Sequence, residues 1–324
     1  MTTDFKGYLL SELMEDYEQG LITRREAGKL IAGIVGSLTL ADVLLAGCTL
    51  VSSKGGEPTV DLGALANGNS AASSVPGTGT SASEPSRASA TRPSGEAADV
   101  QFPGTDTTLL AYLARPAGEG PHPAVLVCHE NRGLTDHIKD VARRLASAGY
   151  VGLAVDLLSR QGGTASVTDS YQSPGILSSQ PPQQFVMDFT EGWRWLPAQP
   201  RVRTEGVGMV GFCFGGGVTW RVAIGLADLR AAVPFYGPHP DPSELDLIQG
   251  AVLAIYAGRD DRINQSVPAI EAEMRRLGKT YEKVIYPNTD HGFHNDTGSR
   301  YDSAAATDAW SRTLAWFDRY LRGP

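Results

Sequence analysis

The last two-thirds of the chain alternates between short apolar segments and longer amphipathic ones. The apolar segments have the length and the β-branched content of buried strands, and they span 107–114, 124–128, 150–155, 207–210, 231–235, 251–258 and 281–286. The amphipathic segments repeat apolar residues at helical spacing and span 136–148, 182–196, 267–277 and 308–321. A polar stretch at 159–179 predicts a long loop. Alternating strands and helices predict an α/β fold, with a mostly parallel sheet and helices on both faces.

The first 48 residues follow another pattern. Residues 4–20 are acidic, and their tyrosines and leucines recur on one face of a predicted helix. Arg24 and Arg25 then precede an apolar run over 30–46, which ends in small residues before Cys48. This order resembles the signal of a lipoprotein exported by the twin-arginine route, with cleavage before Cys48 and a lipid on its sulfur. The acidic leader departs from that pattern, so the alternative is an uncleaved helix that anchors the chain or packs on a partner.

Residues 52–98 are rich in Ser, Ala, Gly, Thr and Pro and contain almost no large apolar side chains. Such a segment buries too little surface to offset its conformational entropy, and we expect a flexible tether. The sequence therefore predicts three parts: a signal segment over 1–47, a tether over 48–98 and a catalytic domain over 99–324. This organisation predicts an exported protein anchored to the membrane on the periplasmic or extracellular side. Without export, the protein would be cytoplasmic.

Charge and cysteine content exclude two classes. The formal net charge of −8, without any basic run, argues against nucleic acid as a partner. Three cysteines are too few for a disulfide scaffold. Cys48 is the predicted lipid acceptor, and Cys128, at the end of a predicted buried strand, is expected to be a small, reduced core residue. The third, Cys213, has a distinctive setting.

Cys213 lies in the run Gly211-Phe212-Cys213-Phe214-Gly215-Gly216, between a predicted strand and a predicted helix. A sharp strand-to-helix turn forces its apex residue into a strained backbone conformation, and flanking glycines relieve the crowding. The apex side chain is then exposed above the sheet, beside the partly positive N-terminus of the helix, which favours a thiolate. This arrangement predicts a nucleophile, the alternative being a buried cysteine in a glycine-rich turn.

Two further residues follow Cys213 in the order found in hydrolases built on this elbow: nucleophile, acid and histidine. Asp260 comes just after the strand at 251–258, and His291 comes after the strand at 281–286. Both positions are carboxyl ends of strands, where the active site of a parallel sheet lies. Asp261 and Asp290 compete with Asp260 as the acid.

Residues 123–321 resemble the dienelactone hydrolase family, a cysteine-using branch of the α/β hydrolases. The resemblance rests on five blocks in order, 129–134, 211–216, 233–237, 258–260 and 290–293. Within the family, the chain is most similar to bacterial members with an N-terminal export-like extension. The resemblance implies the α/β-hydrolase fold and a carboxylic ester hydrolase that cleaves esters or lactones through a Cys-His-Asp triad and a thioester. The family spacing after Gly258 selects Asp260 as the acid.

The resemblance also implies roles around the triad. The backbone amides of Phe214 and Asn131 are expected to form the oxyanion hole, and Glu130 matches a glutamate that contacts the resting thiol and helps to activate it. His129 is expected to be structural. The sequence departs from the family at Asn295, where members acting on a carboxylate-bearing lactone have an arginine. We therefore expect a neutral ester or lactone as substrate. We also expect no cofactor, and the sequence does not indicate an oligomeric state.

Two alternatives come from other classes. His291 and His294, with Asp290 and Asp296, can be interpreted as a metal cluster, but their spacing matches no zinc pattern. The domain can also be interpreted as a non-catalytic, envelope-anchored binding module on a hydrolase scaffold. An intact triad argues against that interpretation, because a binding module has no need for all three groups.

Overall fold

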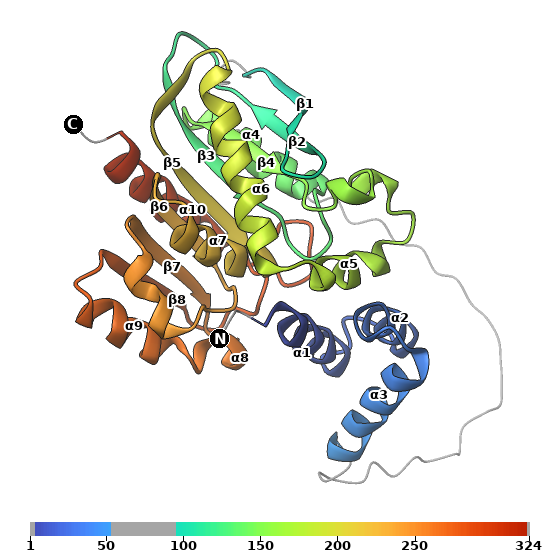
Figure 1. Cartoon of the computed structure of the whole chain (residues 1–324). Coiled ribbons are helices and arrows are strands. Elements are labelled where there is room, and N and C mark those ends of the chain that lie inside the picture. The colour runs from blue at the N-terminus through green and yellow to red at the C-terminus, as the bar shows by residue number, and fades with distance from the viewer. Residues whose placement is uncertain (1–3, 53–94, 323–324) are drawn as a thin grey trace, which may run out of the picture.

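The computed structural model of the chain describes residues 4–52 and 95–322, and its centre is one eight-stranded sheet (Figure 1). The strands lie in the order β1-β2-β4-β3-β5-β6-β7-β8. β1 and β2 pair antiparallel, as do β2 and β4, and all other neighbours are parallel. The strands span β1 Ala97–Pro103, β2 Thr108–Ala114, β3 His122–Cys128, β4 Val151–Val155, β5 Val202–Phe212, β6 Leu229–Phe235, β7 Ala251–Ala257 and β8 Tyr281–Tyr286. The predicted mostly parallel sheet is confirmed.

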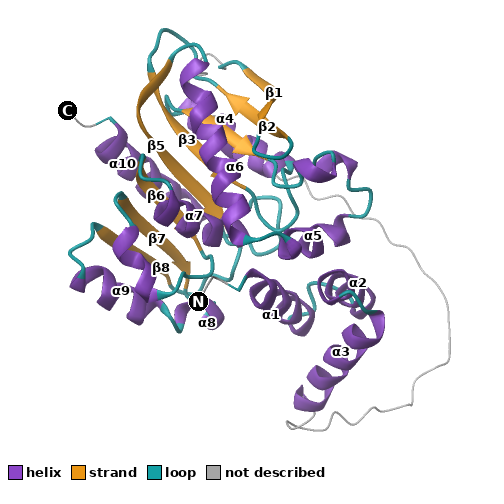
Figure 2. Ribbon diagram, in the orientation of Figure 1, coloured by secondary structure: helices purple, strands orange, loops and turns teal. Residues whose placement is uncertain are grey.

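Helices cover both faces of this sheet, with α6 and α7 in front and α4 and α10 behind in the view of Figures 1 and 2. The helices of this part span α4 Asp136–Ser147, α5 Ser173–Ser179, α6 Pro182–Trp195, α7 Phe214–Gly225, α8 Asp261–Asn264, α9 Val267–Arg276 and α10 Ser303–Leu321. Every residue of β4 and β7 is buried, as expected for strands packed on both faces. Close packing on β5 requires Gly208, because a Cβ there would lie 2.7 Å from Leu321 of α10.

The predicted polar loop over 159–179 contains more structure than its sequence suggested. It includes three short 3₁₀ turns, Ser159–Gln161, Thr164–Ser166 and Ser170–Gln172, and then α5. Gly175 of α5 lies against the backbone of Gly33, so this segment forms a platform for the N-terminal helices. The expectation of a loop was wrong over α5, because a seven-residue helix is too short to show a periodic apolar pattern.

Three helices precede the sheet: α1 Phe5–Glu18, α2 Arg24–Val35 and α3 Leu38–Ser52. The acidic segment predicted as an amphipathic helix is α1. Thr23 and Glu26 form a capping box that begins α2, and Gly36 ends it in the left-handed conformation. Figure 1 shows α1 below the sheet, beside α5 and α8. None of the described helices combines the length and the apolar character needed to span a membrane.

Helix α1 packs on the domain through its apolar face. The ring of Phe5 lies 5.7 Å from that of Phe185 and 4.9 Å from that of Phe214, centroid to centroid. Leu9 and Leu13 are fully buried, with exposed fractions of 0% and 1%. The acidic helix α1 therefore packs on the α/β domain of its own chain.

Most of the predicted tether, residues 53–94, lies outside the described residues. The two predicted ends of the tether fall within the residues that the structure describes. Cys48 lies within α3, and residues 97 and 98 already belong to β1, where Ala98 pairs with Leu113. β1 thus begins two residues before the predicted domain start at 99, because an edge strand can contain alanines and still form backbone hydrogen bonds.

Candidate active site

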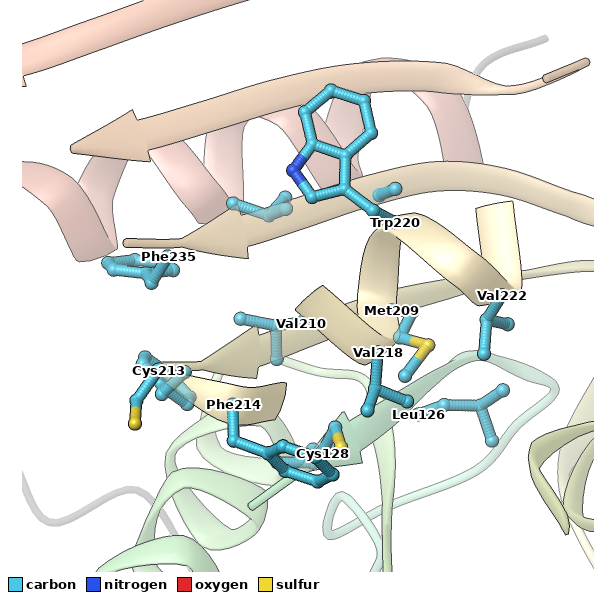
Figure 3. Packing of buried hydrophobic residues seen from close by; sticks show 14 of the residues in the cluster. Leu126, Cys128, Met209, Val210, Cys213, Phe214, Val218, Trp220, Val222 and Phe235 are labelled. Atoms are coloured by element: carbon cyan, nitrogen blue, oxygen red, sulfur yellow. The ribbon is translucent and has the colours of Figure 1, made fainter. Parts of the chain in front are cut away.

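Cys213 occupies the sharp turn between β5 and α7, as the sequence predicted. Its backbone angles, φ 57° and ψ −123°, lie outside the regions that side-chain-bearing residues normally adopt. Glycines make this turn possible: a Cβ at Gly215 would lie 2.5 Å from the carbonyl oxygen of His129, and one at Gly211 would lie 2.2 Å from that of Gly215. Figure 3 shows the Cys213 sulfur pointing away from the apolar cluster under the elbow.

His291 and Asp260 meet beside this elbow. Asp260 follows β7 and caps α8, with Oδ1 accepting a hydrogen bond from the Ile263 amide at 3.2 Å. His291 follows β8, and its Nδ1 lies 2.6 Å from Asp260 Oδ2. Burial alone would raise the pKa of Asp260 and lower that of His291, but the hydrogen bond and charge between them reverse both shifts. The pair therefore favours the carboxylate and a more basic imidazole.

The competing acids lie elsewhere. Asp261 is exposed in the first turn of α8. Asp290 points toward Arg259, with 3.4 Å between its Oδ2 and the guanidinium Nη1. Of the three predicted candidates, the structure brings only Asp260 to His291.

Glu12, which enters the site from α1, is not among the site residues predicted from the sequence. Its Oε1 accepts hydrogen bonds from Cys213 Sγ at 3.1 Å and from Asn131 Nδ2 at 3.1 Å. The hydroxyl of Tyr8, one turn earlier on α1, lies 3.5 Å from the same sulfur. One signal was present in the sequence: Glu12 falls on the apolar face of α1, beside Leu9 and Leu13, where a charged residue needs a buried partner.

Helix α1 also changes the environment of the Cys213 thiol. Cys213 is 3% exposed, and the expected exposed elbow is wrong because α1 covers it. The pKa of its thiol is raised well above the ordinary value, first by burial and then by the charges of Glu12 and Glu130. In the resting site, burial and the two carboxylates therefore oppose the thiolate that the helix N-terminus was expected to favour.

Glu130 lies in the same pocket but contacts a different group. Its Oε2 accepts a hydrogen bond from Asn295 Nδ2 at 2.8 Å. Burial, followed by the charge of Glu12, raises the pKa of Glu130 to about 7. The resting thiol is thus hydrogen-bonded to Glu12 rather than to Glu130. The thiol-activating role of Glu130 stays a prediction. His129 is fully buried, with Nε2 accepting from the Leu157 amide at 3.1 Å, in keeping with a structural role.

A cavity of about 430 Å³ opens in front of Cys213 and His291. Its walls come from the loop after β3, the loop after β8 and the N-terminal segment, including Glu12, Asp16, Leu21 and Ile22. Arg300 also lines it, and its Nη2 contacts Asp16 Oδ1 at 2.6 Å and Gln19 Oε1 at 2.9 Å. The N-terminal segment is therefore one wall of the cavity.

The other predicted metal ligands do not gather around His291. His294 is 1% exposed, and its ring stacks on Phe212 at 4.9 Å. Asp296 pairs with His137 at 3.0 Å and with Arg144. Cys128, on β3, is fully buried and has no disulfide, and Figure 3 shows it among apolar side chains near Phe214.

Comparison with known proteins assigns the family. The sequence profile of the dienelactone hydrolase family matches residues 109–321, about two-thirds of the chain. This chain belongs to that family. Membership makes it a hydrolase, and the matched residues include the elbow at Cys213 and the loop that carries His291. Glu12 lies outside the matched region.

Relatives agree in sequence and structure. A Methylorubrum extorquens protein with a carboxymethylenebutenolidase-type name is 34% identical over 237 residues, covering 69% of this chain and 81% of its own. A similarly named Escherichia coli K12 protein is 31% identical, covering 68% and 86%. A dienelactone hydrolase-type structure from Klebsiella pneumoniae has a TM-score of 0.65 at 32% identity, covering 69% and 99%. A dienelactone hydrolase-like promiscuous phosphotriesterase from metagenomic libraries has a TM-score of 0.64 at 27% identity, covering 70% and 99%.

Proposed function

We propose that the protein cleaves an ester or a lactone, with Cys213 as nucleophile, His291 as general base and Asp260 as the acid that orients it. The observation that carries this proposal is the 2.6 Å contact between His291 Nδ1 and Asp260 Oδ2, next to a cysteine at a strained elbow. With Nδ1 held by the carboxylate, His291 Nε2 is the nitrogen available to accept the thiol proton.

The reaction follows the chemistry of a cysteine acyl enzyme. In the resting site the thiol donates its hydrogen bond to Glu12, so the S–H group must turn toward His291 Nε2 before transfer. The thiolate then adds to the substrate carbonyl, and the alcohol leaves with the proton from His291, which yields a thioester. Water attacks that thioester, with His291 as base, and releases the acid and the free thiol.

The expected oxyanion hole has a structural basis. Phe214 is the first residue of α7, and the first N–H groups of a helix have no partner within it. Asn131 lies in the turn after β3, and its side chain is tied to Glu12 at 3.1 Å. Two backbone N–H groups at this position would stabilise the tetrahedral intermediate, each contributing roughly 3 kcal/mol.

The cavity favours a neutral substrate. Glu12 and Glu130 carry carboxyl groups beside the thiol, and Asn295 stands where a family arginine would bind a carboxylate. Of the cations on the cavity wall, Arg300 already pairs with Asp16, and Arg132 lies over the Tyr171 ring at 5.6 Å. A substrate carboxylate beside Cys213 would meet the carboxyl groups of Glu12 and Glu130 at close range, where like charge disfavours it.

The proposal is tested by a screen of p-nitrophenyl esters and simple lactones against the wild type and Cys213→Ala. We expect hydrolysis by the wild type and less than about 1% of it in the variant, because the residual catalysis of a triad enzyme without its nucleophile is small. Cys128→Val is the matched control and should keep most of the activity, because Cys128 is a core residue remote from solvent.

Thiol reactivity separates this proposal from its alternative, an envelope-anchored binding module. A catalytic Cys213 should form a trapped acyl enzyme with an activated ester, seen as one added acyl group by intact mass. A module that only binds ligands should take up none. Hydrolysis that persists at wild-type level in Cys213→Ala would refute the assigned nucleophile.

A further inference from the structure

Three side chains of different kinds converge at the bottom of the cavity. Glu12 Oε1 lies 3.1 Å from Cys213 Sγ and 3.9 Å from His291 Nε2. All three of these ligand-type atoms lie within 4.8 Å of one another, and the three residues are 3–6% exposed. They come from α1, from the elbow and from the loop after β8. Among the described residues this is the one group of three His, Cys or acidic side chains with such mutual proximity.

Two atoms of this cluster lack the partners that buried polar groups normally have. His291 Nε2 and Glu12 Oε2 are inaccessible to solvent, and neither has a hydrogen-bond partner among the described residues. Leaving one such group unsatisfied costs about 1–3 kcal/mol. Both atoms carry lone pairs and belong to side chains of the cluster, which indicates that the cluster can accept a positively charged ligand.

We propose that Glu12, Cys213 and His291 bind one Zn²⁺ ion. Thiolate, imidazole and carboxylate are the three protein ligand types that zinc takes, at about 2.3 Å for sulfur and about 2.0–2.2 Å for nitrogen and oxygen. Small side-chain shifts bring the three atoms to these lengths. The fourth position faces the 430 Å³ cavity, whose wall includes all three residues.

Neighbouring groups already orient two of the ligands. Asp260 accepts from His291 Nδ1 at 2.6 Å, which fixes the ring and directs the lone pair of Nε2 to the cluster. Asn131 Nδ2 donates to Glu12 Oε1 at 3.1 Å. A carboxylate behind a histidine ligand and a hydrogen bond to a carboxylate ligand are the outer contacts that zinc sites use.

The position of Glu12 is fixed from both ends of α1. Arg262 Nε contacts Glu15 at 3.2 Å, and the Arg262 guanidinium lies 4.7 Å from the centre of the Tyr8 ring. Arg300 pairs with Asp16 at 2.6 Å. The third ligand therefore comes from a helix held on the catalytic domain, although that helix lies outside the region shared with the family.

Binding exchanges a proton for the metal without any redox change. The S–H bond of Cys213 breaks, the Zn–S bond forms, and the proton goes to solvent. Zinc then occupies the sulfur that would attack the substrate and the nitrogen that would accept its proton. The ion is thus a reversible inhibitor of the proposed hydrolysis, and its site exists whether or not that hydrolysis is confirmed.

The test uses the full chain, reduced and stripped of metal with a chelator. Zn²⁺ is titrated in competition with a chromophoric chelator, and Co²⁺ is titrated separately for its thiolate-to-cobalt absorption in the near ultraviolet. We expect one ion per chain, a thiolate band with Co²⁺, and loss of both in Cys213→Ala. Weaker than micromolar Zn²⁺ binding, or a Co²⁺ complex without the thiolate band, would overturn the proposal.

Glu12 is tested by its own series. Glu12→Gln should weaken zinc binding at least about tenfold, since even an outer contact is worth 10–100-fold in affinity. Glu12→His restores a ligand and should recover most of the loss, which separates ligation from folding. Glu18→Gln changes an exposed carboxylate on the same helix and should bind zinc like the wild type. Equal affinities for the wild type and Glu12→Gln would overturn the assignment of α1 to the site.

Discussion

At the Cys213 thiol, burial and two carboxylates act in the same direction. Each disfavours a negative charge on Sγ, so the resting thiol keeps its proton and donates a hydrogen bond to Glu12. An ester that enters the cavity must therefore meet a neutral thiol first. Proton transfer to His291 then depends on the Asp260 contact, which keeps the imidazole basic in spite of its burial.

The role of the acid can be tested by two neighbouring substitutions. Asp260→Asn removes the carboxylate that accepts from His291 Nδ1, and we expect kcat for ester hydrolysis to fall by about 10³–10⁴-fold because the histidine loses its tautomer and orientation. Asp261→Asn is the matched control, since Asp261 is exposed, and should change kcat by less than about twofold. Steady-state kinetics on the best ester provide the measurement, and similar losses in the two variants would contradict the assignment.

His294 predicts the response of stability to acid. Burial lowers its pKa from 6.5 to about 3, with the nearby His137 and Arg144 adding to the shift. Because the unfolded chain binds this proton more readily, stability is fully present above pH 6.5 and is lost as the pH falls toward 3. At pH 5 the loss from this group is about 2 kcal/mol.

His294→Phe keeps an aromatic ring against Phe212 and removes the titration. Urea unfolding at pH 7 and pH 5 should give a free-energy difference about 2 kcal/mol smaller in the variant than in the wild type. If the change in unfolding free energy between pH 7 and pH 5 is equal in the two proteins, the prediction is contradicted. The His294 imidazole would then be protonated in the folded state.

At the scale of elements, α2 docks on α5 through a glycine contact. A Cβ at Gly175 would lie 2.4 Å from the backbone oxygen of Gly33, and neither backbone can move without displacing its helix. Gly175→Ala should therefore lower stability by about 1–3 kcal/mol, as overpacking does. Hydrogen exchange should show the loss of protection concentrated in α2.

The control for this contact is the facing glycine. A Cβ at Gly33 meets its nearest heavy atom at 3.6 Å, an ordinary contact, and Gly33 lies in the interior of α2. Gly33→Ala should leave the melting temperature unchanged or raise it, because alanine favours the helix by about 0.5–1 kcal/mol. A loss as large as that in Gly175→Ala would show that the helices are packed differently.

The strands and helices around the sheet could be predicted from sequence because their signals are local. The strand at β8 was predicted at its observed bounds, and α9 within one residue, from alternation and helical periodicity alone. The meeting of Cys213, Asp260 and His291 could be predicted from the rule that carboxyl ends of parallel strands meet at one edge. The contact between Glu12 and Cys213 joins residues 201 positions apart, and no local pattern reports it. Only the charge of Glu12 on an apolar helix face pointed to a buried partner.

At the scale of the whole molecule, the N-terminal helices belong to the folded catalytic unit. Leu9, Leu30 and Ile31 are fully buried, and Glu12 and Asp16 line the cavity. Cleavage before Cys48 would remove α1 and α2 together with these contacts. It would uncover the aromatic cluster of Phe185 and Phe214, widen the cavity and free the thiol from Glu12.

We propose that the chain is nevertheless an export substrate, on the evidence of Arg24, Arg25 and the small residues before Cys48. Intact-mass measurement of the protein extracted from the membranes of the exporting cells should then show a chain that begins at Cys48 and carries lipid. Cys48→Ser should leave the precursor uncleaved. A soluble protein that retains residues 1–47 would contradict cleavage and lipidation at Cys48 and leave the proposed hydrolysis untouched.

The full chain and a chain that begins at Cys48 also differ in stability and in exposed apolar surface, which an activity assay does not report. A chain that lacks residues 1–47 also lacks the apolar faces of α1 and α2 that cover the domain. It should therefore melt at a lower temperature than the full chain and bind a hydrophobic dye at the uncovered surface. A peptide of residues 1–36, added in trans, should reverse the dye binding, because it restores Phe5 and Leu9 to their sites. If the truncated chain melts like the full one and binds no dye, the packing of α1 contributes nothing to the stability of the catalytic unit. The leader would then be dispensable to the fold, as in an ordinary signal segment.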